Sequence, residues 1–220
     1  IFALMAAMTG SWAQAEEAEP LTQYVDPFIG TDGTGHTFPG PAAPFGMVQP
    51  GPDNGATGWE YTSGYQYSAP VILGFSQTRA SGTGIPELGD VLVMPSRARR
   101  DAFASTYAKA SEVARPGYYA VTLADSGIRA ELTAGARVGI HRYSFPAGQQ
   151  AHLLLDLRSS LYDYPGKILW SGLRLRPDGT VTGFRETRGW APGRKRANGP
   201  MSAPAPTLTP CFSPSMWVKG

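Results

Sequence analysis

The stretch from Gly117 to Pro146, GYYAVTLADSGIRAELTAGARVGIHRYSFP, decides the fold class. Short runs rich in β-branched and aromatic residues alternate with turn signals such as Asp125-Ser126-Gly127, which is the pattern of successive β-strands. Strands at this spacing predict an all-β fold, either an antiparallel β-sandwich or a barrel. The predicted strands are Tyr118–Leu123, Ile128–Thr133, Val138–Phe145, His152–Leu157, Ile168–Leu175 and Val181–Arg185.

Upstream of this stretch, the chain reads as long loops threaded by a few strands, such as Gly46–Gln49 and Asp90–Met94. Helical periodicity is nearly absent, since the best candidate, Asp101–Val113, is polar and is cut off by the sequence RPG that follows it. Long ordered loops on a rigid sheet are usually functional. The first hundred residues are therefore where a site is expected.

Three of these loops are dense in glycine, aromatic and small polar residues. They read GTDGTGHTFPG at 30–40, GWEYTSGYQYS at 58–68 and GFSQTRASGTG at 74–84. Glycine lets a backbone approach a ligand closely, aromatic rings stack on sugar faces, and hydroxyl and amide groups satisfy sugar hydroxyls. The pattern favours a sugar site, and the alternative is that the glycines only punctuate turns.

Length and composition favour one globular domain. The chain has 220 residues, 42% hydrophobic and 16% charged, with 27 glycines and 20 prolines, which is a turn-rich profile rather than a disordered one. A net charge of +2 gives no reason to expect a nucleic-acid partner. The single cysteine, Cys211, excludes an internal disulfide framework.

The first fifteen residues resemble the end of a secretory signal peptide. An apolar run from Ile1 to Trp12 is followed by Ala13-Gln14-Ala15, a small-residue cleavage signal, and then by two glutamates. We expect residues 1–15 to be a signal-peptide remnant and the protein to be secreted or periplasmic. The alternative is a buried N-terminal helix. The run is too short to cross a bilayer, and no other run approaches that length, so no membrane span is expected.

Several familiar chemistries do not fit the spacing of these residues. The loop at 30–40 lacks the lysine of a phosphate-binding P-loop. Ser81 is not in a nucleophile-elbow motif, and no metal-ligand spacing relates the three histidines. His141 and His152 fall inside predicted strands and are expected to be structural, which leaves His36 as the histidine of a site.

Longer segments carry a family resemblance. They are YVDPFIGTDGTGHTFPGPAAPFGMVQPGPDN, GWEYTSGYQYS, GFSQTRASGTGIPELGDVLVMP, ARPGYYAVTLADSGIRAELTAGARVGIHRYSFP and GFRETRGWA, in that order. Together they resemble the N-terminal domain of glycoside hydrolase family 92, over roughly Gln23–Ala191. The resemblance implies a β-sandwich domain over residues 16–191 that packs on a C-terminal (α/α)6 barrel of the same full-length protein.

The activity that this resemblance implies is that of a secreted, Ca²⁺-dependent, inverting exo-α-mannosidase acting on mannose-containing glycans. The acid, the base and most calcium ligands of the family belong to the barrel, so we assign no catalytic residue and no metal ligand here. The alternative is a stand-alone, non-catalytic carbohydrate-binding or interaction module.

The matching loops imply a set of substrate-binding residues at the wall of the pocket. The aromatic members would stack on or shape the pocket, unless they serve interdomain packing, and His36, Gln77 and Arg79 would bond sugar hydroxyls. Many family members have HTH where this chain has QTR at 77–79, which leaves the preferred linkage open. Arg79 could instead neutralise the nearby acids Asp32, Glu60, Glu87 and Asp90. The full set is His36, Thr37, Phe38, Trp59, Tyr65, Tyr67, Gln77, Arg79 and Ser81.

The last residues break with this pattern. Residues 192–220 are rich in proline and lack strand alternation, a composition that predicts neither a strand nor a helix. We expect an out-of-frame tail, and the alternative is a natural Pro-rich linker. In either case the sandwich over 16–191 is expected to be incomplete, with an exposed edge and apolar surface.

Overall fold

The structure is a computed structural model and describes residues 19–85, 87–98, 103–161, 165–188 and 207–208. Within these residues there is no α-helix, only three short 3₁₀ turns, η1 (Leu21–Tyr24), η2 (Trp59–Tyr61) and η3 (Lys109–Ser111). All the strand pairs are antiparallel. The predicted all-β fold is confirmed.

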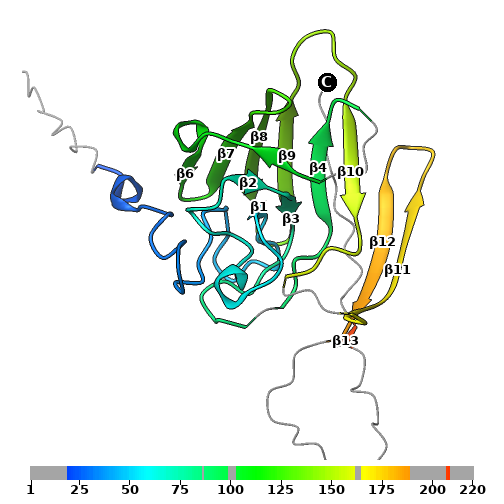
Figure 1. The fold of residues 1–220 in the computed structure, drawn as a ribbon, viewed down its shortest axis with the longest axis horizontal. Coiled ribbons are helices and arrows are strands. Elements are labelled where there is room, and N and C mark those ends of the chain that lie inside the picture. The colour runs from blue at the N-terminus through cyan, green and yellow to red at the C-terminus, as the bar shows by residue number, and fades with distance from the viewer. Residues whose placement is uncertain (1–18, 86, 99–102, 162–164, 189–206, 209–220) are drawn as a thin grey trace, which may run out of the picture.

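Two four-stranded sheets form the body of the molecule (Figure 1). The first has the order β1-β3-β4-β10, made of β1 (Gly51–Asp53), β3 (Gly74–Ser76), β4 (Leu92–Ser96) and β10 (His152–Asp156). The second is a meander of consecutive strands, β6 (Val113–Arg115), β7 (Tyr118–Leu123), β8 (Ile128–Ala134) and β9 (Gly139–Ser144). A small pair, β2 (Val71–Ile72) with β5 (Ser105–Thr106), completes this part of the fold.

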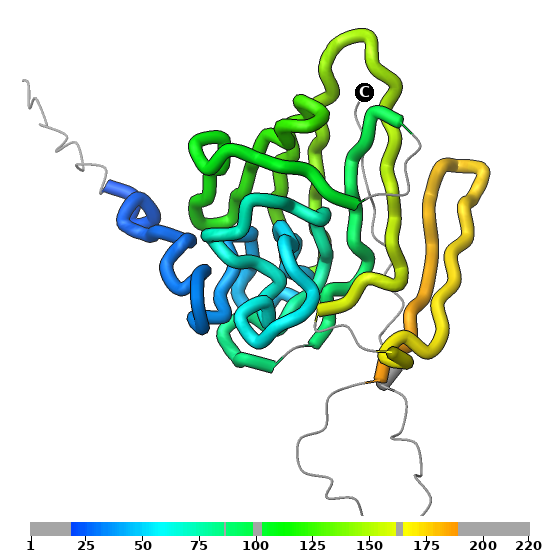
Figure 2. Tube along the Cα trace, viewed as in Figure 1, coloured from blue at the N-terminus to red at the C-terminus, as the bar shows by residue number. Residues whose placement is uncertain are grey.

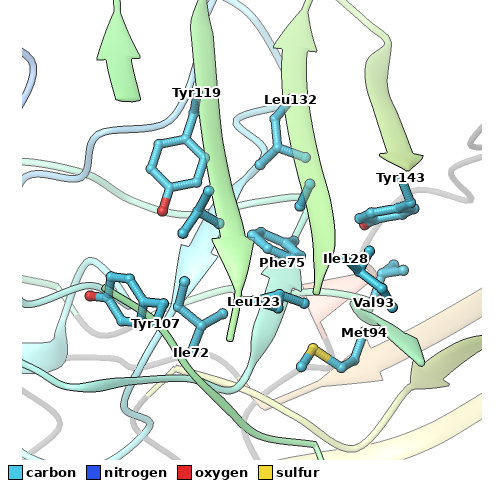
Figure 3. Close-up of a cluster of buried hydrophobic side chains, with 12 residues drawn as sticks. Ile72, Phe75, Val93, Met94, Tyr107, Tyr119, Leu123, Ile128, Leu132 and Tyr143 are labelled. Carbon is cyan, nitrogen blue, oxygen red and sulfur yellow. The ribbon is translucent and has the colours of Figure 1, made fainter. Parts of the chain in front are cut away.

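The core lies between the two sheets, as a sandwich requires. Phe75 and Val93 come from the first sheet and are fully buried, and Phe75 packs 6.1 Å from the ring of Tyr143 in the second. Tyr119 and Leu132 face the same core from β7 and β8, because they are directly paired and so project from one face of their sheet. Figure 3 shows these side chains converging between the strands.

A hairpin stands at one side of the sandwich, beside β10 (Figure 1). It consists of β11 (Ile168–Leu175) and β12 (Val181–Thr187), and the two residues of β13 (Thr207–Leu208) pair with the end of β12. Its large apolar side chains are exposed on both faces. Those on one face are Trp170 and Phe184, and those on the other are Leu173 and Leu175.

The six predicted strands from residue 118 to 185 all form, with ends that shift by at most two residues. The prediction of a strand at Gly46–Gln49 is wrong. The amide of Met47 donates to Ala136 O and that of Gln49 donates to Gln77 O, so this segment bonds to two different neighbours rather than to one partner strand. The strand forms at β1 instead, immediately downstream.

The strand predicted at Asp90–Met94 forms two residues later, as β4. Val91 has φ 55°, a left-handed conformation that a β-branched residue rarely adopts and that interrupts a strand. The candidate helix Asp101–Val113 is not helical in its described part, which contains β5 and η3.

The signal-peptide remnant at residues 1–15 lies outside the described residues, and so does nearly all of the tail at 192–220. The prediction that the tail forms no strand is wrong at Thr207–Leu208, which pair with Glu186 and Thr187. No helix in the described part of the chain is long and apolar enough to cross a membrane.

Candidate functional site

The three glycine-rich loops meet on one side of the sandwich, where Figure 2 shows the chain before β4 folded back on itself in blue and cyan. Backbone and hydroxyl hydrogen bonds join them. Tyr67 N donates to Thr31 O over 2.8 Å, and Gly82 N donates to His36 O over 2.6 Å. Ser63 Oγ donates to Thr37 O over 2.8 Å. The structure therefore brings together the loops that the sequence singled out.

His36 lies where these loops converge. It has φ 59°, a left-handed conformation that is uncommon outside glycine, and such conformations cluster at functional positions. Its side chain is buried and meets the Trp59 ring edge-on, with centroids 4.9 Å apart. His36 Nδ1 is buried and forms no hydrogen bond with any described residue.

Trp59 closes one side of His36 and is 53% exposed. Gly84 lies against both rings, since a Cβ at this position would sit 3.2 Å from Trp59 and 3.5 Å from His36 Nδ1. A buried polar nitrogen thus borders an accessible aromatic face. This combination is suited to a ligand that offers both hydroxyl groups and an apolar face.

Phe38 is half-buried and rests on the guanidinium of Arg79, whose Cζ lies 4.4 Å from the ring centroid. Arg79 is itself buried, and its donors are directed at backbone carbonyls and at Ser76 Oγ. Its ion-pair partner is Asp53, at 3.3 Å. Asp53 lies in the motif PGPDN, but sequence reasoning did not single it out because an aspartate before a turn is common in loops.

Gln77 faces the interior rather than the loops. Its Oε1 lies 2.9 Å from His141 Nε2, and His141 Nδ1 lies 2.7 Å from the Tyr143 hydroxyl. Burial lowers the pKa of His141 to about 4, so the imidazole is neutral at pH 7. The expectation that His141 is structural is confirmed by this position in the core.

Tyr65 also belongs to an interior network. Its hydroxyl donates to Glu112 Oε1 over 2.8 Å, and Tyr119 donates to the same oxygen over 2.6 Å. Burial raises the pKa of both phenols well above the usual value, and the neighbouring Glu112 carboxylate raises it further. Sequence reasoning missed Glu112, because nothing in a loop sequence marks a carboxylate that two distant tyrosines will share.

Lys109 fills a box of aromatic rings next to this network. Its Nζ lies 4.4 Å from the ring centroid of Tyr67, 4.5 Å from that of Tyr107 and 5.1 Å from that of Tyr65, and 3.3 Å from Glu112 Oε2. Tyr67 keeps an exposed surface, whereas Tyr65 is fully buried. Tyr65 therefore packs within the domain, and Tyr67 is the tyrosine of this pair that a ligand can reach.

Thr37 and Ser81 are the two small hydroxyl residues among the candidates. Thr37 Oγ1 donates to Ile29 O over 2.8 Å, which pins the loop to its own start. Ser81 is half-buried and adjoins Gly82, whose amide holds His36. The structure thus pairs His36 with Trp59 and Phe38 with Arg79 in the joined loops. Sugar contacts by the nine candidate residues stay predictions, and the internal hydrogen bonds of Tyr65, Gln77 and Arg79 favour packing roles for these three.

The described residues contain no group of three or more His, Cys, Asp or Glu side chains that could hold a metal ion. Of the four acids that Arg79 was expected to neutralise, Asp32 and Asp90 have other partners, and the ion pair of Arg79 is with Asp53. Asp32 accepts from Ser68 Oγ over 2.9 Å, which lowers the pKa of Asp32, and Asp90 pairs with Arg185 at 3.5 Å.

The fold defines an antiparallel β-sandwich whose glycine- and aromatic-rich loops gather around a buried arginine. Residues 24–200 match the family model described as the glycosyl hydrolase family 92 N-terminal domain. The chain belongs to glycosyl hydrolase family 92, a family of mannosidases, and corresponds to its N-terminal domain. The family resemblance seen in the sequence is confirmed.

Solved structures of this family share the fold. A GH92 α-mannosidase from Bacteroides thetaiotaomicron, in complex with mannoimidazole, is 39% identical with a TM-score of 0.72, and the match covers 77% of this chain and 23% of that one. A second GH92 glycosyl hydrolase is 31% identical with a TM-score of 0.64, covering 77% and 24%.

A curated relative from Arthroderma benhamiae is described as an uncharacterized secreted glycosidase. It is 33% identical over 137 residues, which cover 57% of this chain and 17% of the relative. The chain therefore spans less than a quarter of the length of this relative and of the α-mannosidase from Bacteroides thetaiotaomicron.

Proposed function

We propose that this chain is the substrate-pocket-contributing N-terminal domain of a secreted, inverting α-mannosidase that removes terminal α-mannose from glycans. In this function the loops around His36 form one wall of the pocket, and a C-terminal barrel of the same full-length protein supplies the rest. An inverting glycosidase needs a carboxylic acid and a carboxylate on opposite sides of the scissile bond. The proposal assigns neither role to a residue of this chain.

The observation that carries the proposal is the pairing of His36 with Trp59. An unpartnered buried nitrogen is costly and is usually explained by a ligand or water that completes it. Here the nitrogen borders an accessible tryptophan, and sugars are bound by just such pairs of a hydrogen-bonding group and an aromatic face. His36 would bond a mannose hydroxyl, and Trp59 would pack on the ring.

The names of the relatives support the proposed mannose substrate and the proposed secretion. One is named an α-mannosidase and was solved with mannoimidazole, and another is named a secreted glycosidase. Calcium, which the family resemblance implies, requires six to eight oxygen ligands. The described residues contain no group of three or more His, Cys, Asp or Glu side chains that could hold the ion, and the family resemblance assigns most of its ligands to the barrel, so no step here is derived through calcium.

A titration of the isotopically labelled chain with methyl α-mannoside tests the proposal. We expect the indole N–H resonance of Trp59 and the amides of residues 36–38 to shift with mannoside, and to shift much less with methyl α-galactoside. Trp170, exposed on the distant hairpin, is an internal control whose indole resonance should stay in place. His36→Ala should abolish the response while leaving the core resonances unchanged.

Equal shifts with both sugars, or shifts confined to Trp170, would contradict the pocket role. The chain by itself is expected to bind without cleaving, whereas a family-length protein that contains it should release mannose as the β-anomer first. Release of the α-anomer first would contradict the inverting mechanism.

A further inference from the structure

We propose that Arg79 is a positioning residue. It fixes the conformation of the loop at residues 36–40 through its contacts with Phe38 and Ser63. The inference rests on the proposed function for the identity of the sugar that this loop meets. Its structural part, the control of the loop by Arg79, stands on the contacts within the chain.

The guanidinium of Arg79 has no donor left for a ligand. An arginine side chain carries five N–H donors. Nε donates to Gln49 O over 3.1 Å, Nη1 to Ser63 O over 2.9 Å and to Pro52 O over 3.3 Å, and Nη2 to Gly51 O and Ser76 Oγ over 2.9 and 3.0 Å. The side chain is fully buried. Arg79 therefore acts on a sugar only through the residues that it holds.

Phe38 is the first of these residues, and its ring lies in a slot. One wall is the guanidinium, 4.4 Å from the ring centroid. The other walls are glycine backbones, because a Cβ on Gly51 would lie 2.7 Å from the Phe38 ring and one on Gly40 would lie 2.5 Å from it. Any larger residue at either glycine would displace the ring. The slot thus selects one placement of Phe38.

Ser63 is the second link. Its carbonyl accepts from Arg79 Nη1, and its hydroxyl donates to Thr37 O over 2.8 Å. Thr37 and Phe38 are consequently both tied to Arg79, directly after the strained His36. A left-handed non-glycine residue persists only where its surroundings over-determine it. Arg79 supplies this constraint from one side, and the bond from Gly82 N to His36 O supplies it from the other.

Asp53 makes the arrangement specific for arginine. It lies 3.3 Å from Nη1 and offsets the buried charge, while its Oδ2 accepts from Ser76 N over 2.9 Å. A lysine would keep the charge but has a single nitrogen, which cannot span carbonyls on several sides. Arg79→Lys therefore removes the planar guanidinium and its several donors while it keeps the positive charge.

The test measures amide hydrogen exchange at residue resolution in the wild-type chain, in Arg79→Lys and in Arg185→Lys. Arg185 is a matched control, because it is also buried, pairs with Asp90 at 3.5 Å and donates to Gly89 O. We expect the amides of residues 36–38 and 40 to exchange about tenfold faster in Arg79→Lys, relative to the amides of β7 and β8, because local opening costs less. Arg185→Lys should leave this ratio at its wild-type value.

The mannoside titration of the same three proteins supplies the second arm. We expect the affinity to fall about tenfold in Arg79→Lys, as expected when a pre-organised site must be ordered on binding, and to be unchanged in Arg185→Lys. If the wild type fails to bind mannoside, the proposed function fails, and the exchange ratio still decides the role of Arg79. An unchanged exchange ratio in Arg79→Lys overturns the inference, whatever the titration shows.

A double-mutant cycle shows whether Arg79 acts on the loop through Phe38 or through a general loss of stability. Phe38→Leu removes the aromatic face that the guanidinium supports. The effect of Arg79→Lys on loop exchange should be at least severalfold smaller in the Phe38→Leu background. Full additivity of the two substitutions would show that Arg79 does not act through Phe38.

Discussion

His141 shows how a single residue ties the two sheets together. It projects from β9 in the row formed with Leu132 of β8 and Tyr119 of β7, so it enters the core. Both ring nitrogens have partners there, the Tyr143 hydroxyl and Gln77 Oε1. Gln77 is thus held through its side chain in the core, while the residues that follow it lead into the loop of Arg79.

The buried neutral histidine predicts a specific dependence of stability on pH. Its pKa is lowered from 6.5 to about 4 in the folded chain, so below pH 6.5 the unfolded chain takes up a proton that the folded chain does not. The stabilisation is complete above pH 6.5 and is lost as the pH falls towards 4, to a total of roughly 3 kcal/mol.

Urea denaturation at several pH values between 7 and 4 measures this loss. His141→Gln should flatten the pH dependence between 6.5 and 4, even if it lowers stability at pH 7. His152→Gln, at the half-buried start of β10, is the control and should keep the wild-type slope. A wild-type slope in His141→Gln would show that another group is responsible.

The sequence predicts only part of the site. The loops are found because glycine and aromatic residues are concentrated there, and so are His36 and Trp59, whose rings are in contact. The sequence does not reveal that Gln77 and Tyr65 turn into the interior. Which way a loop side chain points depends on partners far away in the sequence, such as His141 and Glu112.

At the level of elements, the meander β6-β7-β8-β9 follows directly from its sequence. The strands β8 and β9 alternate buried and less buried residues, as β8 does from Ile128 onward, and a period of two is readable without the structure. Gly127 has φ 69°, the conformation that the turn before β8 needs and that glycine adopts freely. The short strands β1 to β5 were harder to predict, because they depend on partners that loops bring together.

The two faces of β8 should respond very differently to truncation. Leu132 is buried and packs in the core, so Leu132→Ala should cost about 2–4 kcal/mol of unfolding free energy. The neighbouring Glu131 forms hydrogen bonds of 2.6 Å with the exposed Arg142 on the opposite face. The Arg142 side chain is 64% exposed, so even this bidentate pair should contribute only about 1 kcal/mol, and Arg142→Ala should lower stability clearly less than Leu132→Ala does.

Chemical denaturation followed by tryptophan fluorescence measures both variants under one set of conditions. A loss in Leu132→Ala no larger than that in Arg142→Ala would mean that β8 does not contribute to the core as described.

At the scale of the whole molecule, the hairpin β11–β12 stands out because it is apolar on both faces. Trp170 is 70% exposed, and Leu175 on the other face is 71% exposed. A hairpin is marginal in water without a layer to pack on, and contiguous exposed apolar surface promotes association. The sequence predicts exposed apolar surface, and the hairpin carries such surface in the described part of the chain.

We therefore predict that the chain self-associates through the hairpin at micromolar concentration. Replacing Leu173 and Leu175 by threonine keeps the β-propensity and removes apolar area, and should shift the chain towards monomer. Phe45→Asn is the control, because Phe45 is fully exposed but lies outside the hairpin and has φ 56°, which asparagine tolerates.

Sedimentation velocity at increasing protein concentration distinguishes these cases. A wild-type chain that stays monomeric, or equal behaviour of the hairpin variant and Phe45→Asn, would contradict a role of the hairpin.

The slot around Phe38 also constrains how related sequences can diverge. A ring, two glycine backbones, a guanidinium and a carboxylate fit one another there, so a change at Arg79 alone leaves a buried carboxylate unpaired, and a change at Gly51 alone collides with the ring. Residues 38, 40, 51, 53 and 79 should consequently vary as a group among natural sequences. Single substitutions within this group should be destabilising. A related protein that acquires a different specificity through this loop should therefore have changed several of these residues together.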